Sequence, residues 1–148
     1  MDTLTFALAM AGYLGLALSS VLIVHGRLGV RFWQLVTAII VAHVLMVWWV
    51  RYGWDPAQAT RRGPAGFIVF HSALAMVLLS LRASEKFRRN LILLSFAIVT
   101  IGALGATARD SSVAMYRVPV AATSLLGLAG ITAGIVRRRR TVRRERSP

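Results

Sequence analysis

Residues 32–50, FWQLVTAIIVAHVLMVWWV, decide the fold, because they carry no charged side chain over the length of a membrane span. A helix rises about 1.5 Å per residue, so a run of this length nearly covers the ~30 Å hydrocarbon core of a bilayer. Four further uncharged apolar runs occupy residues 4–24, 64–81, 91–108 and 118–136. The sequence therefore predicts an all-α protein, an integral membrane bundle of five transmembrane helices.

Composition supports a membrane protein. Hydrophobic residues make up 57% of the 148 residues, whereas soluble domains average about 45–50%. The chain begins Met1-Asp2-Thr3, without the basic segment of a signal peptide, so we expect the first run to be a retained helix. Cysteine is absent, which excludes disulfides, thiolate metal sites and covalently attached haem. We expect a five-helix transmembrane domain over residues 1–136 and a basic cytoplasmic tail over residues 137–148.

The net charge of +13 is unevenly distributed between the predicted connecting segments. Thirteen of the 18 basic residues fall in residues 25–31, 82–90 and 137–148, all on one side of the predicted bundle. The side richer in Lys and Arg is usually cytoplasmic, which predicts an outer N-terminus and a cytoplasmic C-terminus in the inner (plasma) membrane. The tail lacks aromatic residues that could stack on bases, so we expect anionic lipid head groups, or an acidic partner, rather than nucleic acid.

Two histidines lie deep inside consecutive apolar runs. His43 precedes the end of the second run by seven residues, and His71 follows the start of the third by seven, so both are expected about 10 Å below the outer surface. An ionisable residue at such depth is a candidate functional site. Gly12 and Gly102 are expected at a similar depth, where glycine allows the close approach of a flat ligand.

This layer has the groups that one haem b needs, namely an imidazole for each axial position of the iron. Arg51 and Arg117 at the outer rim are candidates for binding its propionates, although arginines near span ends commonly reach the head groups instead. The histidines could equally form hydrogen bonds within the protein. A cluster of aromatic residues at the same rim is typical of an interfacial belt, or of a wall for a quinone head group. These residues are Trp48, Trp49, Tyr52 and Trp54.

The segments VAHVLM (41–46) and VFHSAL (69–74), with the glycines on the flanking runs, resemble the small four-helix membrane b-type cytochromes, such as the ascorbate- and quinol-linked ones. The resemblance covers the first four runs. It implies a haem b with His43 and His71 as metal ligands, and electron transfer near the outer face with quinol as a possible donor. Many such proteins are described as holding two haems with four histidines. This chain has three histidines, enough for one such haem.

The alternative function is a non-catalytic accessory subunit of a larger membrane complex. The short loops leave no room for a soluble catalytic domain, and the five runs contain no Asp or Glu for a proton relay. Gly130 and Gly134 have the GxxxG spacing of a helix-packing face, and we expect them, with Gly127, to contact a partner. Both functions describe a carrier or a subunit rather than an enzyme acting alone.

Overall fold

The chain folds into a bundle of helices in a computed structural model, which describes residues 2–61, 64–109 and 111–145. All regular structure in these ranges is helical. Six helices of the ordinary α type are joined by two short helical turns, η1 and η2. In chain order the elements are α1 (Asp2–Val24), α2 (Val30–Val47), η1 (Trp48–Tyr52), α3 (Pro56–Thr60), α4 (Pro64–Ser80), α5 (Glu85–Arg109), η2 (Ser111–Tyr116) and α6 (Arg117–Glu145).

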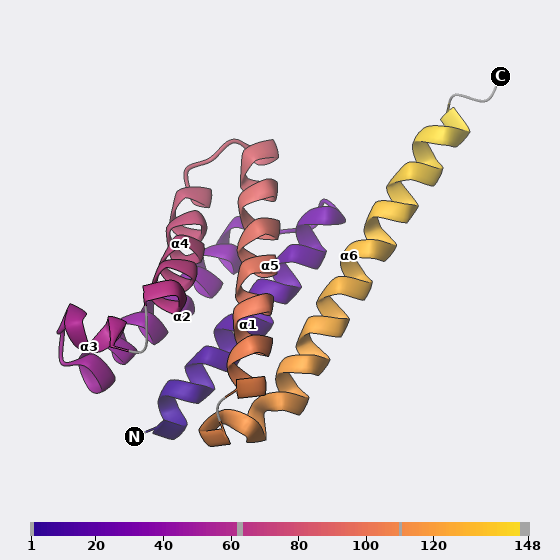
Figure 1. Cartoon of the computed structure of the whole chain (residues 1–148). Helices are drawn as coiled ribbons and strands as arrows, with labels where there is room; N and C mark the ends of the chain where they lie inside the picture. Colours follow the sequence, from indigo (N-terminus) through magenta and orange to yellow (C-terminus); the bar gives the residue numbers. More distant parts are fainter. Residues whose placement is uncertain (1, 62–63, 110, 146–148) are drawn as a thin grey trace.

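The five long helices alternate in direction through the bundle, so the N-terminus and the end of α6 lie at opposite ends (Figure 1). Helix α1 packs against α2, α5 and α6, and α5 makes its most extensive contact with α4. We name the two ends by their contents. The α3 end holds the N-terminus, η1, α3 and η2, and the basic end holds the α1–α2 turn, the α4–α5 turn and the C-terminal part of α6 (Figure 1).

Four helical segments of the described residues are long and apolar enough to cross a membrane, so the prediction of five is wrong by one. They are Thr3–Val24, Val30–Tyr52, Glu85–Arg109 and Val113–Arg140. The missing one is α4, an apolar helix of 17 residues whose length of about 25 Å falls short of the ~30 Å core. Helix α6 continues without a break from Arg117 to Glu145, so most of the predicted tail, residues 137–148, belongs to the last helix.

Glycines allow the close approach of α1 to its neighbours. A methyl group at Gly130 would lie 2.6 Å from Cγ2 of Val21, and one at Gly134 would lie 2.6 Å from Cγ1 of Val24. Gly127 is similarly covered by the ring of Phe96 on α5. The three glycines of α6 therefore pack inside the chain. The expectation that they contact a partner is wrong, because helical spacing predicts a packing face without naming the neighbour.

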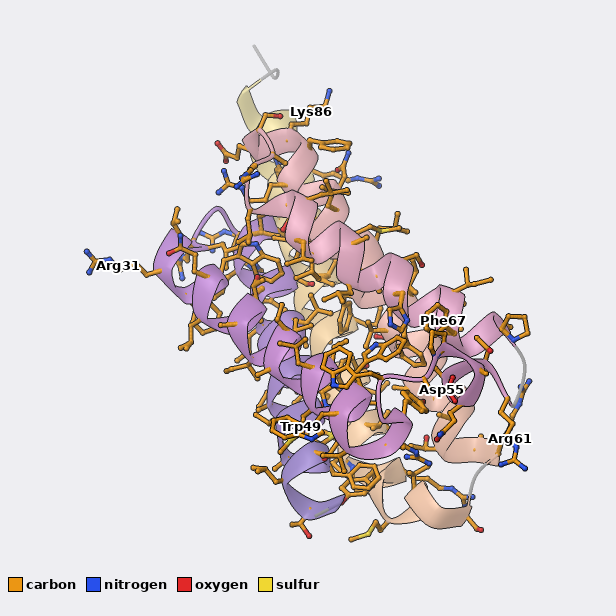
Figure 2. All side chains as sticks on the ribbon, turned by 90° about the vertical axis from the view of Figure 1, so that its left-hand side faces the viewer. Arg31, Trp49, Asp55, Arg61, Phe67 and Lys86 are labelled. Atoms are coloured by element: carbon orange, nitrogen blue, oxygen red, sulfur yellow. The ribbon has the colours of Figure 1, made fainter. Side chains whose placement is uncertain are left out.

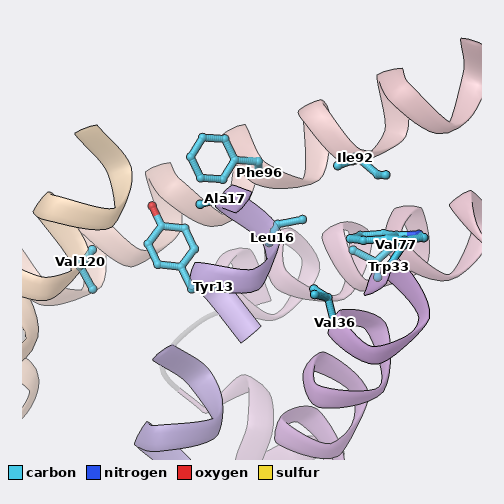
Figure 3. Packing of buried hydrophobic residues seen from close by; sticks show 9 residues of the cluster. All are labelled: Tyr13, Leu16, Ala17, Trp33, Val36, Val77, Ile92, Phe96 and Val120. Carbon is cyan, nitrogen blue, oxygen red and sulfur yellow. The ribbon is translucent and has the colours of Figure 1, made fainter. Parts of the chain in front are cut away.

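The buried core combines large apolar side chains with hydroxyl groups. Tyr13 lies between Phe96 of α5 and Val120 of α6 (Figure 3). Its hydroxyl group is 2.8 Å from Oγ1 of Thr100 and 2.7 Å from Oγ of Ser124, which joins three helices. The apolar part of the core comprises Tyr13, Leu16, Ala17, Trp33, Val36, Val77, Ile92, Phe96 and Val120.

Candidate functional site

The candidate site lies at the α3 end and contains both predicted ligands, His43 and His71. Trp48 follows His43 by five residues along α2 and η1, and it hydrogen-bonds His71. Trp48 therefore links His71 to the segment that follows His43. Both side chains are half-buried.

His43 points to α1. Its Nδ1 atom lies 3.0 Å from the carbonyl oxygen of Thr5, near the start of that helix. A carbonyl only accepts hydrogen bonds, so this contact requires a proton on Nδ1. The imidazole thus connects α2 to α1 across 38 positions of sequence.

Both ring nitrogens of His71 are engaged by protein groups. The indole Nε1–H of Trp48 donates to Nε2 of His71 at 3.1 Å, and Nδ1 of His71 lies 2.8 Å from the carbonyl oxygen of Phe67. An indole only donates and a carbonyl only accepts, so these partners together fix the neutral tautomer with its proton on Nδ1. Neither nitrogen of His71 is left for another group in this arrangement.

Aromatic rings surround His71. Phe67, one turn earlier on α4, stacks on the imidazole with ring centroids 3.9 Å apart. Trp48 meets the imidazole edge-on at 5.8 Å, and Tyr52, Trp54 and Phe67 all lie within 6.0 Å of the Trp48 ring. We call these five side chains, Trp48, Tyr52, Trp54, Phe67 and His71, the histidine–aromatic cluster.

The backbone around η1 is what assembles this cluster. The chain leaves α2 as one π-helical turn, and such turns are frequent at functional sites. Gly53 and Trp54 then adopt positive φ angles of 54° and 63°, which reverses the chain and stacks Trp54 on Trp48 at 5.9 Å. A non-glycine residue in that conformation is strained and persists only where its surroundings hold it. Trp49 is 75% exposed and lies on the other side of η1 from Phe67 (Figure 2).

Three of the other predicted site residues, Gly12, Gly102 and Arg117, contact groups within the chain. A methyl group at Gly12 would lie 3.1 Å from Cγ1 of Ile40 on α2, and one at Gly102 would lie 2.7 Å from Cζ of Phe70 on α4. Arg117 donates from Nε to the carbonyl oxygen of Thr107 at 2.8 Å, which places a cation at the C-terminal end of α5. Arg51 is exposed on η1.

Haem ligation by the histidine pair stays a prediction. In the arrangement described, His71 has no ring nitrogen free for iron, so the residues fit a haem only if Trp48 gives up its hydrogen bond. Side chains of the same chain fill the space beside Gly12 and Gly102. Among the residues that the structure describes, no group of three or more His, Cys, Asp or Glu could hold a metal ion, and a bis-histidine haem would not require one.

Sequence reasoning missed the role of Trp48 and of the hydroxyl group of Tyr13. The double tryptophan at 48 and 49 is typical of an interfacial belt, and the spacing alone did not show that one indole faces inward. The signal that could have found it is that Trp48 stands five residues after a histidine on one span and is followed by a Gly53-Trp54 turn.

No protein-family model, no curated protein and no solved structure was found to match this chain.

Proposed function

We propose that this protein is a non-catalytic accessory subunit of a membrane complex, with its basic end in the cytoplasm. One observation carries the proposal: both ring nitrogens of His71, and Nδ1 of His43, are hydrogen-bonded to groups of the same chain. His71 binds Trp48 and Phe67, His43 binds Thr5, and the glycines pack against side chains of the same chain. Such an arrangement favours a structural role for the histidines over the binding of a substrate.

Helix α6 is the element best placed to meet a partner. Within the described residues it contacts α1, α5 and η2, and it lies at one side of the bundle, with its C-terminal part extending past the end of α1 (Figure 1). Its glycines face inward, whereas Leu125 and Leu126 are 68% and 70% exposed. Small residues thus hold α6 to its own bundle, and its large apolar residues are left for lipid or for another protein.

A pair of bulky substitutions tests this role. Leu126→Trp on α6 keeps the surface apolar, so lipid can still solvate it, but the larger ring would displace a packed helix. Leu79→Trp on α4, which is 62% exposed, is the matched control. We expect the α6 variant to reduce the fixed-ratio co-purification of a larger subunit from native membranes, while the α4 variant leaves the ratio unchanged. A protein that purifies alone in all three forms contradicts the proposal.

The second candidate is a haem b protein that transfers electrons near the outer face, which would use the two histidines that the sequence predicts at a similar depth. The visible absorption spectrum of the purified protein distinguishes the two functions. The accessory subunit is colourless, whereas a bis-histidine haem gives a Soret band that His43→Ala or His71→Ala abolishes. His25→Ala is the matched control, since His25 lies at the basic end and its Nδ1 is 2.9 Å from the Val21 carbonyl oxygen.

A further inference from the structure

A pocket opens at the basic end, where the end of α1, the start of α5 and the C-terminal part of α6 meet. Its volume is about 770 Å³, within the range of about 300–1,000 Å³ that is usual for small-molecule sites. Its lining residues belong to the basic end, opposite the α3 end that holds the histidine–aromatic cluster (Figure 1). The lining residues are Ile23, Val24, His25, Gly26, Arg27, Glu85, Lys86, Arg89, Gly134, Arg137 and Arg138.

The lining carries a strong positive charge. Five basic side chains surround the pocket, against the single carboxylate of Glu85. They come from three separate segments: Arg27 follows α1, Lys86 and Arg89 lie in the first two turns of α5, and the others belong to α6. Like charges brought together from three segments repel one another, so an anion bound between them would stabilise the arrangement.

The end of α1 positions Arg27 through its backbone. Gly26 has a φ angle of +67°, and the backbone N–H of Arg27 donates to the carbonyl oxygen of Leu22 at 2.8 Å. This is the hydrogen-bond pattern of a helix that ends in a left-handed glycine. Arg27 is therefore held at a defined place beside the ends of α5 and α6.

The pocket also has an apolar side. Ile23 and Val24 belong to the last turn of the first membrane-spanning helix, and Gly134 is on the last one. A methyl group at Gly134 would lie 2.6 Å from Val24 and 2.8 Å from Cε1 of His25, so α1 and α6 touch here. The charged groups and the apolar surface thus meet where the spans end.

We propose that this pocket binds the phosphodiester head group of an anionic phospholipid, with the first acyl carbons along Ile23 and Val24. Guanidinium groups match the geometry of phosphate oxygens in paired hydrogen bonds. Basic pockets between membrane helices on the cytoplasmic side are suited to anionic head groups. A soluble phosphate would use the same cations, but it would gain nothing from the apolar side of the pocket.

Two double variants of equal charge test the site. Arg27→Gln with Arg89→Gln removes two pocket cations. Arg31→Gln with Arg82→Gln removes two exposed arginines from the same basic stretches of sequence, residues 25–31 and 82–90. Neither of these arginines lines the pocket. Arg31 projects away from the bundle (Figure 2). The readout is native mass spectrometry of the purified full chain in detergent, titrated with phosphatidylglycerol, phosphatidylcholine or inorganic phosphate.

We expect one tightly bound phosphatidylglycerol on the wild-type chain and weaker binding of phosphatidylcholine. Each arginine near a membrane surface contributes roughly a fivefold gain in affinity for an anionic lipid. The pocket variant lacks two of them, so it should bind phosphatidylglycerol about 25-fold more weakly. The exposed-arginine variant should retain wild-type affinity. If the pocket variant does not fold, as judged by circular dichroism, the single variant Arg138→Gln replaces it, with an expected loss of about fivefold.

Three results would overturn the proposal. Equal losses in the two double variants would mean that only the overall surface charge attracts lipid. Equal affinity for phosphatidylcholine would mean that the head-group charge is not recognised. Inorganic phosphate binding as tightly as the lipid would assign the pocket to a soluble phosphate compound instead.

Discussion

The hydroxyl group of Tyr13 offers the sharpest test of how this bundle is held together. In Tyr13→Phe the ring keeps its place beside Phe96, where the centroids lie 6.0 Å apart, so the apolar packing is retained. The variant loses the contacts with Thr100 and Ser124, at 2.8 and 2.7 Å. The change therefore isolates two hydrogen bonds between helices that are far apart in sequence.

The expected cost follows from these contacts. Hydrogen bonds between membrane helices average about 0.6 kcal/mol each and reach about 1.7. Ser124 retains its bond to the Val120 carbonyl oxygen at 2.7 Å, whereas the structure gives Thr100 no second side-chain bond among the described residues. We therefore expect the free energy of unfolding to fall by about 1–2 kcal/mol, with most of the loss on the Thr100 side.

The assay is unfolding by sodium dodecyl sulfate in mixed micelles, followed by far-ultraviolet circular dichroism. Ser20→Ala is the matched control, since Ser20 is also buried but its hydroxyl group donates within α1 to the Leu16 carbonyl oxygen at 2.8 Å. Combining Tyr13→Phe with Thr100→Val in a double-mutant cycle measures the coupling directly. A loss no larger in Tyr13→Phe than in Ser20→Ala, or a coupling near zero, would refute the reasoning.

Two further predictions concern helix packing and topology. Gly130→Leu should lower the free energy of unfolding by about 1–3 kcal/mol, because the new side chain would overlap Val21. Gly105→Ala is the control: its methyl group would meet no atom within 4 Å, so the free energy of unfolding should stay unchanged or rise. Thermal unfolding of both variants measures the difference. Helix α4 is shorter than the four segments that have the length of a span, but it runs from one end of the bundle to the other (Figure 1). We expect it to cross where the bilayer thins around it, so reporter fusions should place the N-terminus outside and the C-terminus in the cytoplasm; termini on the same side would mean that only the four longer segments cross.

Hydrophobic patterning predicted the positions of all five long helices, because an uncharged apolar run has few other stable conformations in a membrane. It erred on the third run, residues 64–81, which was counted as a span although its helix, Pro64–Ser80, has only 17 residues. The chain leaves the helix there through bonds from Leu81 and Arg82 to the Leu78 and Leu79 carbonyl oxygens, a tighter turn than the sequence revealed.

The candidate site was harder to predict, because the depth of a residue along its helix does not determine the direction in which its side chain points. Counting residues from the span ends predicts a similar depth for His43 and His71, and the structure gives the two rings different partners, Thr5 for His43 and Trp48 for His71. Which way each ring points depends on the rotation of its helix and on the turn at η1. A π-helical turn followed by two residues of positive φ is not encoded in hydrophobic periodicity, so the partners Thr5 and Trp48 could not be foreseen.

The two ends of the bundle differ in how their side chains are used: aromatic residues pack together at the α3 end, and charged residues line a pocket at the basic end. At the α3 end, the imidazole of His71 is hydrogen-bonded to Trp48 and stacked on Phe67 of the same chain. These contacts make that end rigid without a ligand. At the basic end, Arg27 and Arg89 gather around a pocket that is open and far richer in cations than in carboxylates. Groups that already have partners stabilise the fold, whereas like charges held close together are stabilised by binding an anion. The basic end is therefore where binding of a ligand should most increase the stability of this protein.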